Sequence, residues 1–131
     1  AKWTGNYAVG YMWKKRGKAF GVHEVLQYDL YGNIAETTGS NIFVVMESGL
    51  VLTPPLDCVL DGINRRRAIE ILTALGYQVR EQHITLGHIA NAREIFLTGT
   101  WSGIVPVSVL LTVGRRCGRS SWTVCCPHRV R

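Results

Sequence analysis

The helix pattern INRRRAIEILTALG at residues 63–76 most constrains the fold, since short strand patterns stand on both sides of it. Its apolar residues recur near helical spacing, and Gly76 suits a helix C-terminus. The strand patterns are EVLQYD at 24–29, IAETTGSNIFVVM at 34–46, LVLT at 50–53, YQVREQHI at 77–84, EIFLTGT at 94–100 and GIVPVSV at 103–109. Strands separated by turns, with helices between some of them, predict a mixed α/β domain.

Two further segments have helix patterns. NYAVGYMWKKRGKAFG at 6–21 carries basic residues toward its end and finishes at a glycine, and TLGHIANA at 85–92 has Thr85 as a candidate N-cap. Turns are expected at Gly32–Asn33, within TTGS and at ESG. There is no GxGxxG after a strand and no Walker loop, so a dinucleotide-binding or P-loop fold is not supported.

Charge divides the chain near residue 110. All nine acidic residues lie before residue 95, whereas residues 115–131 contain arginines without acids and three of the four cysteines. We therefore predict a patterned domain over 1–108 and an Arg/Cys-rich tail over 109–131 without regular structure. The abrupt change is typical of a frameshift near residues 108–112, which translation of the coding DNA in the other frames would test.

The sequence favours a protein with no membrane partner. Its longest apolar run, at 103–113, is too short to span a bilayer and contains Pro106. The N-terminus does not resemble a signal peptide, and we expect a cytoplasmic protein. The arginines of the tail lack regular spacing, so no nucleic-acid partner is expected either.

Three local features are compatible with a ligand site. DGIN at 61–64 places backbone N–H groups at a helix N-terminus, which suits a phosphate, and TGT at 98–100 follows an apolar strand. Glu36 lies in a largely apolar segment and needs a partner if it is buried. Each also has an ordinary interpretation, namely any helix start, a strand-ending turn and a surface acid. The run Arg65–Arg67 is expected to be a solvated face.

No metal site is expected. His83 and His88 are five residues apart rather than the four that aligns ligands on one helix face. The tail residues Cys117, Cys125, Cys126 and His128 lack the usual ligand spacing. Cys58 has no obvious histidine partner, so we expect a structural thiol there.

The order of these motifs resembles the C-terminal large domain of the class IV pyridoxal-phosphate aminotransferases. The resemblance rests on AKWTGNY, then GVHEVLQYDLYGNIAETTGSNIFVV, LVLTPP, LDGINRRRAIEIL and VREQHITLGHIANAREIFLTGT, and covers residues 1–108. It implies the pseudo-barrel domain of fold type IV. The Lys-x-x-Gly-Asn-Tyr opening favours the branched-chain amino-acid aminotransferases.

The resemblance also implies residue roles. Lys2 matches the catalytic lysine that carries pyridoxal 5'-phosphate covalently, and Tyr7 matches the tyrosine that hydrogen-bonds the cofactor's phenolic oxygen. Glu36 matches the carboxylate that pairs with the pyridine nitrogen, and Leu60 matches the residue against the ring. The remaining matches are Ile63, Asn64, Gly99 and Thr100 for the phosphate, and Thr100 and Trp101 for the substrate. Asn64 replaces a usual Thr, and Trp101 replaces a usual small residue.

The implied function is amino-group transfer between a branched-chain amino acid and 2-oxoglutarate, by a homodimer in the full-length family. The N-terminal domain of the family and its usual C-terminal segment have no counterpart here, so the chain is expected to be a fragment whose own activity is open. The alternatives are another class IV enzyme, such as a D-amino-acid or (R)-amine transaminase or an aminodeoxychorismate lyase, and a non-catalytic fragment.

Overall fold

The structure is a computed structural model that describes the backbone of residues 4–113 and 121–125 and the side chains of residues 8–110. The elements along the chain are α1 (Thr4–Ala19), β1 (Glu24–Tyr28), β2 (Ile34–Thr37), β3 (Asn41–Met46), β4 (Val51–Thr53), α2 (Ile63–Ala74), β5 (Val79–Glu81), α3 (Leu86–Ala90), β6 (Ala92–Gly99), β7 (Gly103–Pro106), β8 (Val109–Val113) and β9 (Ser121–Cys125). The prediction of a mixed α/β fold is confirmed.

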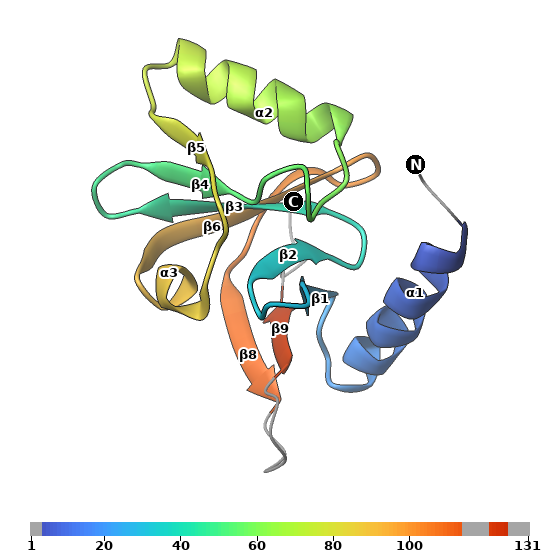
Figure 1. Cartoon of the computed structure of the whole chain (residues 1–131). Coiled ribbons are helices and arrows are strands. Elements are labelled where there is room, and N and C mark those ends of the chain that lie inside the picture. The colour runs from blue at the N-terminus through green and yellow to red at the C-terminus, as the bar shows by residue number, and fades with distance from the viewer. Residues whose placement is uncertain (1–3, 114–120, 126–131) are drawn as a thin grey trace, which may run out of the picture.

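The strands form two sheets (Figure 1). One has four strands in the order β2-β1-β9-β8, and the other has five in the order β5-β4-β3-β6-β7. β4 and β5 pair in parallel, with α2 as the crossover between them, while β3 pairs with β4 and β6 in antiparallel fashion. β3 therefore lies in the middle of the larger sheet.

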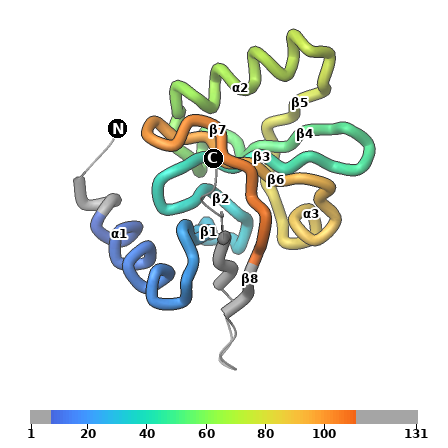
Figure 2. Tube along the Cα trace, turned by 180° about the vertical axis from the view of Figure 1, so that it is seen from behind, coloured from blue at the N-terminus to red at the C-terminus, as the bar shows by residue number. Residues whose placement is uncertain are grey.

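Alternation along β3 creates two cores, because successive side chains of a strand point to opposite faces. Ile42 and Val44 belong to the larger core, which also contains residues of β1, β2 and α3. Phe43 faces α2 and stacks on Phe96 of β6 with ring centroids 4.8 Å apart. Figures 1 and 2 show α2 on one side of the larger sheet, with α3 and the smaller sheet on the other.

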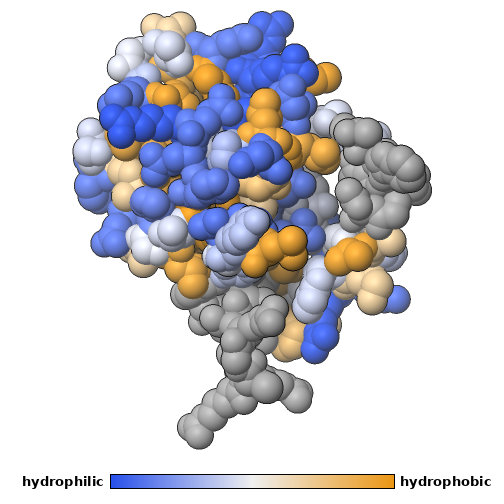
Figure 3. All heavy atoms as spheres, viewed as in Figure 1, coloured by the Kyte–Doolittle hydropathy of each residue, from blue (hydrophilic) through white to orange (hydrophobic). Residues whose placement is uncertain are grey.

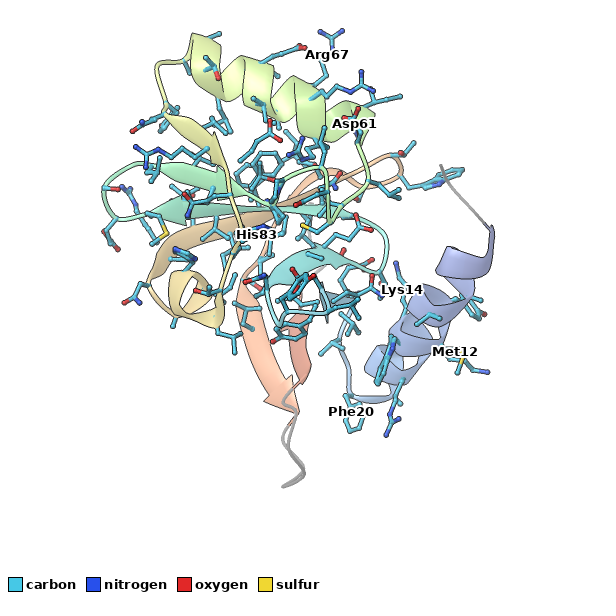
Figure 4. All side chains as sticks on the ribbon, viewed as in Figure 1. Met12, Lys14, Phe20, Asp61, Arg67 and His83 are labelled. Carbon is cyan, nitrogen blue, oxygen red and sulfur yellow. The ribbon has the colours of Figure 1, made fainter. Side chains whose placement is uncertain are left out.

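The helix α1 packs against β1. The approach is close at Gly17, where an added Cβ would lie 2.8 Å from a methyl group of Val25. Lys14 forms an ion pair with Glu24, whose other carboxylate oxygen accepts a hydrogen bond from Thr38 at 2.6 Å. Figure 4 shows Lys14 on the side of α1 toward the sheets and Met12 on the opposite side. These contacts hold α1 beside the turn between β2 and β3.

Most element boundaries agree with those predicted. α2 is followed by Gly76 with a φ of +86°, a conformation that glycine adopts without strain. Thr85 is the N-cap of α3. Figure 3 shows a largely hydrophilic face with hydrophobic residues interspersed. Within the described residues, no helix has both the length and the apolar character that crossing a bilayer requires.

The segment after residue 108 differs from the expectation of no regular structure. β8 and β9 lie in this segment and pair with each other, and β9 also pairs with β1. The physical reason is composition, since VLLTV and SWTVC are rich in β-branched and aromatic residues that favour strands. The domain boundary near residue 108 stays a prediction.

Replacing Ile34 with Ala should lower the free energy of unfolding by about 2–5 kcal/mol, because it removes buried methylene groups from the larger core. The measurement is urea-induced unfolding. Ile71→Ala is the matched control, since Ile71 is more than half exposed on α2 and its loss should change stability by about 0.5 kcal/mol or less. Equal losses for the two variants would contradict this assignment of the core.

Candidate active-site cleft

A cleft of about 580 Å³ opens beside the start of α2, where β2 and β6 end and β3 begins. Seven of the nine residues to which the family resemblance assigns a role line this cleft: Glu36, Leu60, Ile63, Asn64, Gly99, Thr100 and Trp101. The other two are not placed, since Lys2 and the side chain of Tyr7 lie outside the described residues. Segments far apart in sequence therefore meet at a single cleft.

Glu36 is half-buried at the wall of this cleft. Its Oε2 accepts hydrogen bonds from the backbone N–H of Leu60 at 3.3 Å and from Nδ2 of Asn41 at 3.4 Å. Burial raises the pKa of the Glu36 carboxyl group, and the Leu60 N–H opposes this in part. A carboxylate in this environment gains most from a cationic partner.

The start of α2 has the opposite electrostatic character to Glu36. Gly62 is the N-cap, and no side chain caps the first turn. An added Cβ at Gly62 would lie 2.3 Å from Oδ1 of Asn41, so only glycine fits between α2 and β3. The first N–H groups of a helix lack partners within the helix and carry a partial positive charge. This end of the cleft is suited to an anion.

Asn64 connects the two segments that were singled out for phosphate binding. Its Nδ2 donates to the Gly99 carbonyl oxygen at 2.7 Å. Gly99 itself is tightly enclosed, because an added Cβ would lie 2.6 Å from Oγ of Ser40. The turn after β6 is thus held against the first turn of α2.

Arg65 corrects the expectation that the basic run at 65–67 is a solvated face. Arg66 and Arg67 are exposed, but Arg65 is only 1% exposed. Its Nη2 donates to the Pro54 carbonyl oxygen at 2.8 Å and to Glu81 at 2.6 Å. The helix turns one arginine of the run inward, where Pro54, directly after β4, and Glu81 of β5 supply its acceptors.

Two further residues of the cleft have contrasting exposure. Thr98 is 1% exposed, and its hydroxyl group has no hydrogen-bond partner in the part of the chain that the structure describes. A buried hydroxyl without a partner is costly, so it is a candidate ligand contact. Trp101 is fully exposed at the rim and does not fill the cleft.

Asn41 and Arg65 are cleft residues that were not foreseen, and Thr98 was noted only as part of TGT at 98–100. Asn41 was assigned only to a strand, although its Nδ2 donates to the Leu60 carbonyl oxygen at 2.9 Å and holds the loop before α2. Buried asparagine at the start of an apolar strand was the available signal, because such an amide needs partners. No local pattern distinguishes Arg65 from its neighbours.

Cys58 differs from the expectation that it has no histidine partner. Ligand atoms of Asp57, Cys58 and His83 all lie within 4.8 Å of one another. The Cys58 thiol donates to the Pro55 carbonyl oxygen. Burial, with Asp57 next in importance, raises the pKa of Cys58 to about 11. The thiol is therefore protonated near neutral pH.

The fold agrees with the comparisons to known proteins. Residues 2–110 match the sequence profile of the family described as Amino-transferase class IV. The chain therefore belongs to the class IV aminotransferase family. Its fold, which the sequence analysis assigned to this family, is that of solved branched-chain aminotransferases.

Several proteins that resemble this chain are branched-chain aminotransferases. The chain is 40% identical over 100 residues to a probable branched-chain-amino-acid aminotransferase of Rickettsia felis, covering 76% of this chain and 34% of the relative. It resembles the branched-chain aminotransferase of Thermoproteus uzoniensis, solved with norvaline, with a TM-score of 0.77 and 37% identity, over 81% of this chain and 36% of that one. An aminotransferase from Brucella abortus, bound to the cofactor PLP, gives a TM-score of 0.74 and 37% identity, over 81% and 38%. This chain thus spans about a third of the length of these relatives.

The raised pKa of Glu36 predicts a pH dependence of stability. Between its ordinary value of 4.5 and the higher folded-state pKa, the folded chain binds more protons than the unfolded chain. The contribution of Glu36 to the free energy of unfolding therefore falls as pH rises through this window. Glu36→Gln should lack this loss. In urea unfolding at several pH values, the free energy of unfolding of the variant relative to the parent chain should therefore increase as pH rises.

Glu47→Gln is the control, because Glu47 is an exposed acid in the turn between β3 and β4. The pH-dependent gain should be absent or smaller there. A gap between the parent chain and Glu36→Gln that stays constant with pH would contradict the burial of this carboxyl group.

Proposed function

We propose that this chain is part of a pyridoxal-phosphate-dependent aminotransferase that transfers an amino group between a branched-chain amino acid and 2-oxoglutarate. Relatives that are 35–40% identical carry the branched-chain aminotransferase name. Since the chain spans about a third of their length, the complete activity belongs to the whole protein. In this proposal residues 1–108 form the aminotransferase part and residues 109–131 a tail, within which β9 pairs with β1 of that part.

The observation that carries the proposal is that one cleft presents two features of opposite character. One is the half-buried carboxyl group of Glu36, which gains from a cationic partner. The other is the uncapped start of α2, which attracts an anion. Pyridoxal phosphate has a protonatable ring nitrogen and a phosphate group, so it supplies both charges.

The donor set fits the phosphate group. The first N–H groups of α2 and the unpartnered hydroxyl group of Thr98 border the same cleft as Gly99 and Thr100. Nδ2 of Asn64 carries two hydrogens, and one of them is donated to the Gly99 carbonyl oxygen. The other remains as a further donor. In this proposal Ile63 contributes its backbone N–H, while Leu60 lies against the ring.

When bound, the cofactor acts as an electron sink that stabilises negative charge at the Cα atom of the amino acid. Glu36 keeps a proton on the ring nitrogen through a charge-assisted hydrogen bond. Lys2 would carry the cofactor, and its amine, once freed, would accept the proton from Cα, a role that requires a depressed amine pKa. Tyr7 donates to the phenolic oxygen.

The substrate side involves Thr100 and Trp101, which lie at the rim. Trp101 is fully exposed at this rim, and in this proposal it contacts a substrate or a neighbouring part of the protein. We further propose that the whole protein is cytoplasmic and that it is a homodimer, as the family resemblance implies.

Pyridoxal phosphate added to the purified chain should produce a visible absorbance band and, after borohydride reduction, a covalent adduct on the peptide that contains Lys2. The measurement is mass spectrometry of the digested chain. Lys2→Ala should lose the adduct. Lys18→Ala, which removes an exposed lysine near the end of α1, should keep it. An adduct that survives in Lys2→Ala would refute the assigned role of Lys2.

Asn64→Asp should weaken binding of pyridoxal phosphate about tenfold or more, because a carboxylate at the first turn of α2 repels the phosphate group. Binding is measured by fluorescence titration. Asn91→Asp adds the same charge at the end of α3, away from this cleft, and should leave the affinity unchanged. Equal affinity of Asn64→Asp and the parent chain would place the phosphate group elsewhere.

A further inference from the structure

The loop between β4 and α2 and the loop between β5 and α3 bring three ligand types together outside the residues assigned to the cofactor. Asp57 and Cys58 are adjacent in the first loop, and His83 lies in the second. Their ligand atoms lie within 4.8 Å of one another, and Oδ2 of Asp57 is 3.8 Å from Nε2 of His83. Figure 4 labels His83 on the stretch between β5 and α3.

We propose that Asp57, Cys58 and His83 form a zinc-binding site with three protein ligands and one open position. This goes beyond the proposed aminotransferase function, and it does not depend on it. Carboxylate, thiolate and imidazole are the three side-chain groups that Zn²⁺ binds most often, and sites with three protein ligands and one water are common.

The distances suit the ion. With bonds of about 2.0–2.3 Å, neighbouring ligand atoms in a tetrahedral zinc site lie about 3.4–3.7 Å apart. The separation of Asp57 and His83 already approaches this value. Asp57 and His83 are exposed and Cys58 is half-buried, so modest side-chain rotation brings all three ligands onto one ion that solvent can deliver.

The surrounding charge also favours a cation. The carboxylates of Asp57, Asp29 and Glu36 all act electrostatically on the Cys58 sulfur, and Asp29 also acts on His83. The existing contact between Asp57 and His83 is long and exposed, so it stabilises the fold little by itself. Coordination forms a zinc–sulfur bond and releases the thiol proton to solvent.

Zinc would join two loops that are 25 residues apart in sequence, one of which continues to Leu60 and the cleft. Asp57 and Cys58 themselves line the cleft. The site therefore borders the cleft, and Glu36 lies close enough to act electrostatically on Cys58.

The test uses the full chain, without pyridoxal phosphate, in a background where Cys117, Cys125 and Cys126 are serine. That background removes the other thiols of the sequence. Zn²⁺ is titrated calorimetrically, and Co²⁺ reports a thiolate ligand through its near-ultraviolet charge-transfer band. One equivalent of each ion should bind. Cys58→Ser should abolish the band, and His83→Gln and Asp57→Asn should each weaken Zn²⁺ binding about tenfold or more.

His88→Gln is the matched control, since Gln at this position of α3 can keep the hydrogen bond that His88 accepts from the backbone N–H of Thr85. It should bind Zn²⁺ as the background chain does. The two exposed positions, Asp57 and His83, keep the test valid even if Cys58→Ser fails to fold. No Zn²⁺ binding in the serine background, or unchanged affinity in both His83→Gln and Asp57→Asn, overturns the proposal.

Discussion

The cleft depends on the buried guanidinium group of Arg65, which fixes the start of α2 against the larger sheet. It joins the Pro54 carbonyl oxygen at the end of β4 to Glu81 in β5. Removing one partner of a fully buried charged pair costs about 3–5 kcal/mol, but the Glu81 side chain is 46% exposed and solvent screening reduces this. The position of Arg65 matters more than its contribution to stability, because Asn64, the residue before it, holds the turn after β6 through its hydrogen bond to Gly99.

Around this anchor, short polar links assemble the cleft from separate segments. Asn64 ties α2 to Gly99, and Asn41 ties β3 to the loop at Leu60, which in turn donates to Glu36. Each link uses a side-chain amide or a backbone group, whose directional hydrogen bonds set position more sharply than apolar packing does. The two hydrophobic cores on either face of β3 then supply the stability that keeps these links in place.

The sequence predicted the helices and strands better than the residues of the cleft, and the difference has physical reasons. The helix α2 and the strand β3 were recognised from the spacing or run of their apolar residues, although Ile63 and Ile71 of α2 are exposed. Glu36 and Gly99 were recognised only through the order of motifs, since each has an ordinary alternative. Arg65 was missed because a run of arginines does not reveal which one the helix turns inward, and the proximity of Cys58 to His83 was missed because it arises from two loops.

The cleft contains two features that each lower the stability of a fold, and one bound ligand can account for both. Glu36 is a half-buried acid without a cationic partner among the described side chains, and α2 begins without a side-chain cap. Either alone lowers stability, because a buried charge and unsatisfied N–H groups both lose hydration. Both features line one cleft, so a single ligand can compensate both, with its cationic part at Glu36 and its anionic part at α2. Departures from local consistency of this kind are typical of functional sites.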